Sequence, residues 1–331
     1  MLEHGGRLLR AAHEHGIAPA EWLDLSTGIS PFPWPVPEVP ATAWHRLPED
    51  DDGLLDVAAD YYGTRQLLPV AGSQVAIQAL PTLRPASQVG VVAPGYAEHA
   101  HAWERAGHAV TLASVDTLLD TASRFDVIVL IHPNNPDAHL LDLSQLLRLH
   151  QQLAARGGWL VVDEAFMDVT PQHSLCPHAG REGLIVLRSV GKFFGMAGAR
   201  AGFVAADPSL REALHEHLGP WTLSGPTRHV LKRALADHAW QAQARQRLPL
   251  VAARLADMLA RHGLPSSAGC GLFQWCRDER ATTLHHHLAS RGILTRLFDT
   301  PPSLRFGLPG DDAAFGRLDA ALIEMMAEVL A

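Results

Sequence analysis

The chain has 331 residues, of which 47% are hydrophobic and 19% charged, and its formal net charge is −8 at pH 7. This length allows one large domain and a smaller one, and the hydrophobic content excludes a long disordered chain. An acidic balance without a basic block argues against a nucleic-acid partner.

Cysteine and histidine usage also narrows the class of protein. The three cysteines, Cys176, Cys270 and Cys276, form no CxxC pair, so we expect reduced thiols. The N-terminus lacks a signal-peptide core and no stretch can span a bilayer, which predicts a soluble, cytoplasmic protein without a membrane partner. Twenty histidines include a run at 285–287, but none has acidic or cysteine companions at metal-site spacing. We expect no metal site and solvated positions for most histidines.

In the first third of the chain, the sequence predicts helices separated by an extended segment. A helix within residues 1–22 ends at Gly16, WLDLSTGIS forms a strand and turn, and the proline-dense PFPWPVPEVP is extended. Residues 53–62 have helical spacing. A further helix begins near Ser73 after a turn of small residues, where exposed amide donors suit a phosphate. A simple serine N-cap is the alternative at this position.

From residue 88 onward, short apolar runs alternate with helical segments. The expected strands are 88–93, 109–113, 126–131, 159–162, 184–187 and 202–205, with helices at 97–106 and 143–155. This alternation indicates a mostly parallel sheet with helices on both faces. Helical spacing returns at 209–261, interrupted by GPWTLSGP. Strands at 271–275 and 304–307 and a helix from 313 predict a small α+β domain, which the N-terminal segment completes.

The stretch from 184 to 205, LIVLRSVGKFFGMAGARAGFVA, carries the strongest chemical signal. Lys192 and Lys232 are the only two lysines, and Lys192 follows a buried strand. A desolvated lysine amine can lose its proton, which suits Schiff-base chemistry with pyridoxal phosphate. Ser189 and Arg200 add hydroxyl and guanidinium donors for a phosphate. The alternative is a solvated loop lysine.

Four other side chains follow strand ends that a parallel sheet brings to the same edge. Asp163, in DEAF, can pair with a protonated pyridine nitrogen, and His99 can hydrogen-bond it from behind. Asn135, in HPNNP, offers an amide for a ring hydroxyl. Tyr96, in APGYAEH, offers a flat face for stacking. Taken singly, these residues also fit an N-cap, a turn and core packing, so their order and spacing carry the signal.

The elements AGSQ, PGY, NNP, DEAF, SVGK, GxR and SLRFGLP together resemble the fold-type I pyridoxal-phosphate enzymes of the aspartate and histidinol-phosphate aminotransferase superfamily, over nearly the whole chain. The resemblance implies that Lys192 is the Schiff-base lysine and Asp163 the partner of the pyridine nitrogen. Asn135 would bind the ring hydroxyl and Tyr96 would stack on the ring. It assigns the cofactor phosphate to Gly72, Ser73, Gln74, Ser189 and Arg200. It assigns the substrate carboxylate to Arg305.

The N-terminal stretches EHGGRL, WLDLSTGISPFPWP and HRLPEDDDGLLDVAADYYG are similar to the threonine-phosphate decarboxylases of cobalamin biosynthesis. That family converts L-threonine O-3-phosphate to (R)-1-aminopropan-2-yl phosphate. The resemblance implies that an N-terminal segment, 1–40, joins the small domain and covers the active site. A large cofactor-binding domain, 41–225, and a small domain, 226–331, would follow. Candidates for substrate contacts are His4, Gly5, Gly6, Ser30, Asn135 and Arg296.

Several positions depart from the family pattern. Phe166 replaces a common tyrosine, Asp137-Ala138 replaces Thr-Gly, and Ser30 replaces asparagine. Leu47 stands where many relatives carry a tyrosine that reaches the partner subunit, although a homodimer is still expected. Two alternatives to a decarboxylase remain: an aminotransferase of the histidinol-phosphate type, and a non-catalytic member of the superfamily.

Overall fold

A computed structural model describes residues 2–329 of the chain. Contacts between residues divide it into two compact units. The larger unit comprises Pro33–Asn135 and His139–Ala242; the smaller comprises the chain up to Phe32, Pro136–Ala138 and the chain from Gln243 onward. The domain limits at residues 40 and 225 stay a prediction. Within the described residues, no helix combines the length and the apolar content needed to cross a membrane.

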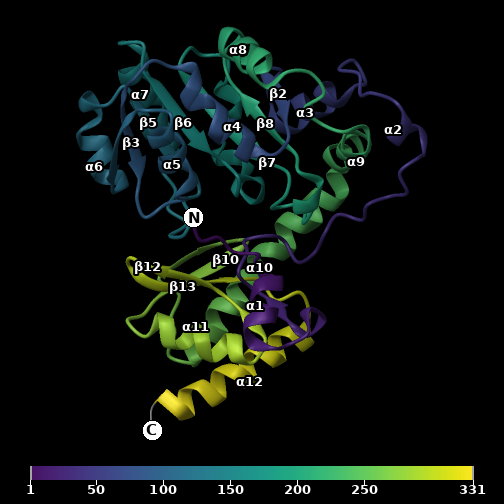
Figure 1. The fold of residues 1–331 in the computed structure, drawn as a ribbon, viewed down its shortest axis with the longest axis vertical. Helices are drawn as coiled ribbons and strands as arrows, with labels where there is room; N and C mark the ends of the chain where they lie inside the picture. Colours follow the sequence, from purple (N-terminus) through teal and green to yellow (C-terminus); the bar gives the residue numbers. More distant parts are fainter. Residues whose placement is uncertain (1, 330–331) are drawn as a thin grey trace. The chain divides into compact units, whose positions relative to one another are not determined.

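A seven-stranded sheet, in the order β2-β8-β7-β6-β5-β3-β4, forms the centre of the larger unit (Figure 1). Its strands are β2 (Leu67–Val70), β3 (Gln88–Val92), β4 (Ala109–Ala113), β5 (Val127–Ile131), β6 (Trp159–Asp163), β7 (Leu184–Ser189) and β8 (Gly202–Ala205). β8 is antiparallel to β2 and β7, and the other pairings are parallel. The predicted mostly parallel sheet is confirmed. The sequence did not predict β2, a four-residue edge strand that contains a proline.

Both faces of this sheet are buried. Val127 and Val129 belong to a core that also includes residues of α4 (Ser73–Ala79), α5 (Glu98–Arg105) and α8 (Pro208–Leu218). Ile128 alternates with them on the opposite face and is also fully buried. On that face Gly90 lets α6 (Val115–Asp120) approach closely, because a Cβ there would lie 2.7 Å from Leu118 Cδ2. Burial on both faces explains why these strands read as continuous apolar runs.

Further helices surround the sheet or lie on the segment before it. They are α2 (Thr42–His45), α3 (Leu54–Tyr62), α7 (Leu143–Ala154) and α9 (Gly225–Ala236). Short 3₁₀ turns cover η1 (Pro19–Glu21), η2 (Leu80–Leu83), η3 (Ala122–Arg124), η4 (Met167–Val169), η5 (Pro171–His173), η6 (Cys176–His178) and η7 (Ala197–Ala199). Long helix α10 (His238–Arg261) begins in the larger unit and continues into the smaller one.

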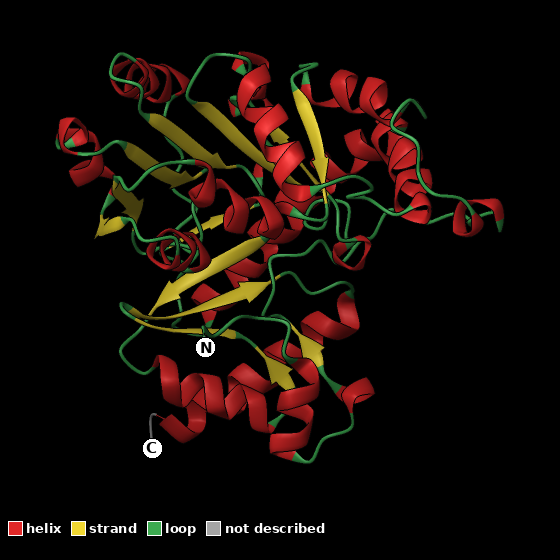
Figure 2. Cartoon of the chain, turned by 45° about the horizontal axis from the view of Figure 1, so that its top comes forward, coloured by secondary structure: helices red, strands yellow, loops and turns green. Residues whose placement is uncertain are grey.

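The smaller unit is α+β, as predicted (Figure 2). Its antiparallel sheet has the order β12 (Arg296–Asp299), β13 (Pro302–Gly307), β10 (Phe273–Arg277) and β9 (Ala268–Cys270). Its helices are α1 (Leu8–His15), α11 (Ala281–Ser290) and α12 (Asp312–Val329). The N-terminal segment completes this unit, because β1 (Leu23–Asp24) pairs in parallel with β11 (Ile293–Leu294) and Trp22 is buried against Ala289 of α11.

Candidate active site

The register of the large sheet brings the predicted cofactor residues to one edge. Asp163, the last residue of β6, is aligned with Ile131 of β5 and with Leu187 of β7. Because these strands are parallel, the loops that carry Asn135 and Lys192 leave from the same edge as Asp163. The antiparallel strand β8 begins at this edge, where Gly202 pairs with Val70 on one side and Ser189 on the other.

One corner of this edge gathers donors suited to a phosphate. α4 begins at Ser73, and the preceding Gly72 has a φ of 85°, a left-handed conformation that favours glycine. A Cβ at Gly72 would lie 2.8 Å from Nη2 of Arg200, and one at Gly202 would lie 2.9 Å from the backbone nitrogen of Ser73. The two glycines therefore make room for the Arg200 guanidinium beside the first amides of α4, where an anion is favoured.

Asp163 lies at the centre of the edge and is buried, with 4% of its surface exposed. Its Oδ2 is 2.9 Å from Nε2 of the buried His99, so the predicted hydrogen bond is present. Its Oδ1 accepts a hydrogen bond of 3.0 Å from the backbone nitrogen of Ala165. An ionised carboxylate only accepts, so the His99 nitrogen that faces it carries the hydrogen. The two donors fix the direction of the carboxylate.

Tyr96 and Gln74 form a second polar contact at this edge. The Tyr96 hydroxyl donates to Oε1 of Gln74 at 3.0 Å, and Nε2 of Gln74 donates to Oε2 of Glu98 at 2.9 Å. The Tyr96 ring meets the His99 ring edge-on, with 6.1 Å between centroids. The half-buried ring of Tyr96 is thus held from two sides.

The loops after β5 and β7 carry Asn135 and Lys192, which are both half-buried. The Lys192 amine lies 5.6 Å from the ring centroid of buried Phe166. The loop of Asn135 is braced by Asn134, whose Nδ2 donates to the carbonyl of Pro94 at 2.9 Å. It is also braced by His132, whose Nε2 lies 3.1 Å from both the nitrogen and the oxygen of Leu141. Burial lowers the pKa of His132 to about 4.

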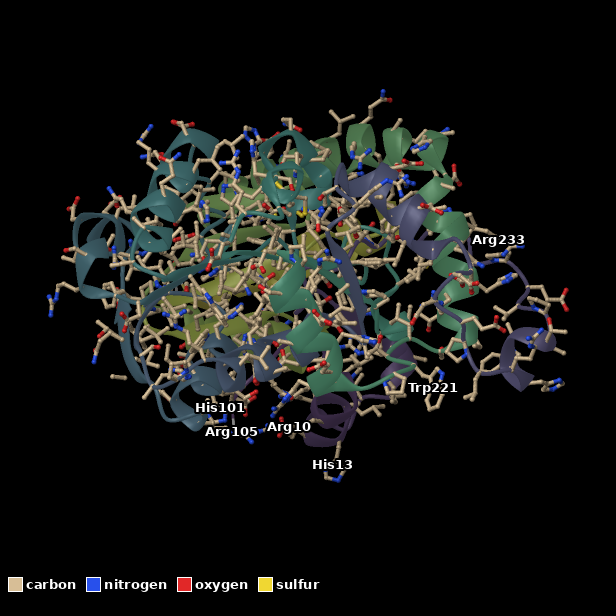
Figure 3. All side chains as sticks on the ribbon, turned by 90° about the horizontal axis from the view of Figure 1, so that it is seen from above. Arg10, His13, His101, Arg105, Trp221 and Arg233 are labelled. Atoms are coloured by element: carbon tan, nitrogen blue, oxygen red, sulfur yellow. The ribbon has the colours of Figure 1, made fainter. Side chains whose placement is uncertain are left out.

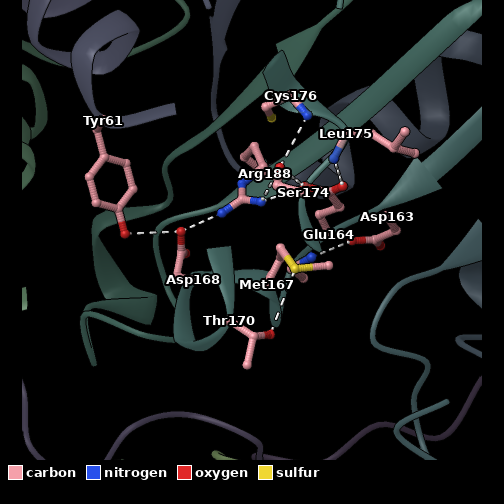
Figure 4. Close-up of polar contacts among 11 residues, drawn as sticks. Tyr61, Asp163, Glu164, Met167, Asp168, Thr170, Ser174, Leu175, Cys176 and Arg188 are labelled. Carbon is pink, nitrogen blue, oxygen red and sulfur yellow. Dashed lines mark hydrogen bonds and ion pairs between the residues drawn. The ribbon is translucent and has the colours of Figure 1, made fainter. Parts of the chain in front are cut away.

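A buried charge network beside Asp163 was not predicted (Figure 4). Arg188 of β7, 1% exposed, contacts Glu164 with 2.5 Å between Nη1 and Oε2, and also forms an ion pair with Asp168. Glu164 accepts further hydrogen bonds from Ser174 and from the backbone of Leu175, and the Tyr61 hydroxyl donates to Asp168. The sequence signal was an arginine inside the apolar run LIVLRS.

This network restrains the segment that follows Asp163. Burial raises the pKa of Glu164, whereas the Arg188 guanidinium acts in the opposite direction. Buried ion pairs repay their desolvation only when geometry and hydrogen bonding are good, and removing one partner costs about 3–5 kcal/mol. Arg188 therefore holds Glu164 and Asp168, which flank Phe166, on the sheet.

In the smaller unit, Arg296 and Arg305 are direct neighbours across the β12–β13 pair. Arg305 is 6% exposed, and its Nη2 donates to the carbonyl of Ser26 at 3.0 Å. Burial and the nearby Arg296 charge lower the pKa of Arg305 to about 10. Half-buried Arg296 donates to the carbonyl of Glu3 at 2.5 Å. The two arginines therefore place two positive charges on neighbouring positions of the β12–β13 pair.

A cavity of about 390 Å³ in this unit is lined by His4, Gly5, Ser26, Arg296 and residues of α1 and α11. The backbone nitrogen of Gly6 donates to Oγ of Ser26 at 2.7 Å, which fixes the N-terminal segment. Ser30 is buried in a turn, where its hydroxyl bonds the backbone of Phe32. Of the residues predicted to contact the substrate, His4, Gly5 and Arg296 therefore line one cavity. Ser30 instead bonds the backbone of the turn in which it lies.

The run at 285–287 corrects one expectation. His285 is half-buried, lines the same cavity and has its Nδ1 2.9 Å from Oγ1 of Thr295. Its burial lowers its pKa to about 4, with nearby positive groups contributing. A solvated position is therefore wrong for His285, whereas His286 is exposed as expected. Consecutive residues on a helix point in different directions, which explains the difference.

Comparison with known proteins assigns the chain to a family. Residues 50–319 match the model of aminotransferase class I and II. The chain belongs to this family. Members with similar sequences include a threonine-phosphate decarboxylase of Pseudomonas aeruginosa, 55% identical over 326 residues and 98% of each chain. Another, from Sinorhizobium sp, is 43% identical over 98% of each chain.

Solved structures agree on the fold. A histidinol-phosphate aminotransferase from Sinorhizobium meliloti, solved in complex with pyridoxal-5′-phosphate, superposes with a TM-score of 0.86. It covers 99% of this chain and 96% of its own, at 20% identity. The fold-type I assignment is therefore confirmed for this member of the aminotransferase class I and II family.

Proposed function

We propose that the protein is a pyridoxal 5′-phosphate-dependent decarboxylase that converts L-threonine O-3-phosphate to (R)-1-aminopropan-2-yl phosphate, a reaction of cobalamin biosynthesis. The observation that carries the proposal is the 55% identity to a threonine-phosphate decarboxylase across 98% of both chains. The paired arginines of the smaller unit support it, because this substrate has two anionic groups, a carboxylate and a phosphate.

The residues of the large sheet edge fit the cofactor. The space that Gly72 leaves for the Arg200 guanidinium, beside the first amides of α4, suits a phosphate dianion. Ser73, Ser189 and Arg200 would bind that group, Asn135 the ring hydroxyl, and Tyr96 the ring face. Asp163 would face the pyridine nitrogen. Lys192 would hold the cofactor through its amine.

When bound, pyridoxal phosphate supplies an electron-withdrawing ring that weakens one bond at the α-carbon of the substrate. Asp163, held by His99 and Ala165, keeps a negative charge at a fixed position for the ring nitrogen. Arg305 would orient the substrate carboxylate that leaves as carbon dioxide. Nζ of Lys192 would deliver the proton that takes its place on the α-carbon. Arg296 and His4 would bind the substrate phosphate.

We also propose a cytoplasmic homodimer. Exposed apolar side chains of the larger unit support it: Val36, Trp44, Leu47 and Trp221 are 56–68% exposed. The Trp221 ring projects outward from the surface (Figure 3). Sedimentation of wild type, Trp44→Asp and Leu47→Asp tests the proposal, with Leu112→Asp on edge strand β4 as an exposed control. Dissociation of the first two variants alone is expected, and an active wild-type monomer contradicts the dimer.

The decisive experiment mixes the holoenzyme with O-phospho-L-threonine and measures carbon dioxide and keto acid together. Carbon dioxide with aminopropanol phosphate supports the decarboxylase. Stoichiometric keto acid with an amino-group acceptor would assign an aminotransferase instead. The bond at the α-carbon that stands perpendicular to the ring decides between the two, and that torsion is set by the groups that bind the carboxylate and phosphate.

A further inference from the structure

The side chain of Gln74 is engaged at both ends. Its Oε1 accepts from the Tyr96 hydroxyl at 3.0 Å, and its Nε2 donates to Oε2 of Glu98 at 2.9 Å. The opposite orientation of the amide would set its oxygen against the Glu98 carboxylate, two acceptors without a hydrogen between them. The orientation of the amide, and with it the acceptor for Tyr96, is therefore fixed by Glu98.

These contacts connect the start of α4 with the centre of the sheet edge. Gln74 lies in the first turn of α4, while Tyr96 and Glu98 belong to the loop after β3 and the start of α5. The Tyr96 ring then meets His99, which bonds Asp163. Gln74, Tyr96, His99 and Asp163 thus form one continuous chain of contacts, from the phosphate corner to the carboxylate.

We propose that Gln74 is a positioning residue that sets the tilt of the Tyr96 ring, and that its side chain does not bind the cofactor phosphate. The inference rests on the proposed function, because it concerns the ring against which the cofactor would lie. The cofactor phosphate would then be bound by the backbone amides of α4, by Ser73 and Ser189, and by Arg200. Holding the hydroxyl restricts the rotation of the tyrosine ring about its two side-chain torsions, so less freedom is lost when a flat ligand stacks on it.

Two ligands separate this role from a phosphate contact. Apoprotein is titrated with pyridoxal 5′-phosphate and with pyridoxal, which lacks the phosphate, and the dissociation constants are read from the visible absorbance. Gln74→Leu is expected to weaken both ligands by the same factor, about fivefold to tenfold, the value of one hydrogen bond. Tyr96→Phe should weaken both by a similar factor. Gln78→Leu, on the exposed side of α4, is the matched control and should change neither.

The double variant gives the second measurement. If Gln74 acts through Tyr96, then Gln74→Leu combined with Tyr96→Phe loses no more affinity than either alone. A loss confined to pyridoxal 5′-phosphate, or a double variant in which the factors multiply, overturns the inference. Tyr96→Phe removes the same bond without altering α4, so equal loss for both ligands remains testable if Gln74→Leu does not fold. Failure of wild type to bind pyridoxal 5′-phosphate would instead contradict the proposed function.

Discussion

Nε2 of His99 lies 2.9 Å from Oδ2 of Asp163, and both side chains are buried beneath the edge of the large sheet. The residues are 64 positions apart in the sequence, one on α5 and the other at the end of β6. Together with the Ala165 amide, His99 fixes the direction of the carboxylate. A charge held in place before the ligand arrives needs no reorganisation during the reaction.

Removing this contact should weaken the cofactor site without unfolding the protein. His99→Phe keeps an aromatic ring but deletes the donor, and a hydrogen bond to a charged group is worth about 1.5–3 kcal/mol. We expect the dissociation constant for pyridoxal 5′-phosphate to rise about tenfold or more. His101→Phe, an exposed position on the same helix, should leave it unchanged. An unaltered constant in His99→Phe would mean that the Ala165 amide alone suffices.

Asp163→Asn tests the charge itself. The variant keeps the size of the side chain, so cofactor still binds, but turnover should fall by several orders of magnitude because the ring nitrogen loses its anionic partner. Cofactor content from absorbance and turnover from carbon dioxide release are compared in one preparation. Near-normal turnover would reduce Asp163 to a structural role.

Lys192→Ala should abolish the visible absorbance of the cofactor-loaded protein, whereas Lys232→Ala should keep it. Lys232 is half-buried and forms an ion pair with Asp52 at 3.2 Å. Its loss should therefore cost only about 1 kcal/mol or less of stability. A visible aldimine absorbance that survives in Lys192→Ala and is bleached by borohydride would contradict the assignment.

Arg296→Ala should weaken binding of O-phospho-threonine much more than binding of threonine. Loss of a partly buried phosphate contact costs about 2–3 kcal/mol, or roughly 30- to 150-fold in affinity. Dissociation constants for both ligands are measured by calorimetry, with Arg277→Ala, an exposed arginine of the same sheet, as the control. Equal losses for both ligands would assign Arg296 to holding the Glu3 carbonyl, and the phosphate would then be bound by His4 and the adjacent glycines.

The buried His132 predicts a loss of stability in mild acid. Its pKa is about 4 when folded and 6.5 when exposed, so between these values the unfolded chain binds a proton that the folded chain does not. The free energy of unfolding therefore falls as pH drops from about 6.5 towards 4, by up to about 3 kcal/mol. Urea unfolding of wild type and His132→Gln at pH 7.5, 5.5 and 4.5 measures this contribution. An equal pH slope in both proteins would rule it out.

The other six strands of the large sheet and the grouping of residues at its edge followed from the sequence alone, whereas β2 did not. Continuous apolar runs ended at Ala93, Ile131 and Val162, and strands of one parallel sheet carry their functional loops at one edge, so residues distant in sequence could be grouped without coordinates. A hydrogen bond between His99 and Asp163 was predictable for the same reason. Sequence patterns alone can therefore locate a residue whose position depends only on the strand that it follows.

Only the tertiary structure determined the contacts that depend on the direction of each side chain. The amide of Gln74 bonds Tyr96 and Glu98, Arg188 lies buried between Glu164 and Asp168, and His285 is half-buried against Thr295 whereas the next residue, His286, is exposed. A sequence states which groups a residue carries, but hydrogen bonds require atoms within about 3 Å at favourable angles. That precision arises only when separate elements pack, and packing determines which polar groups lose water and must find a partner.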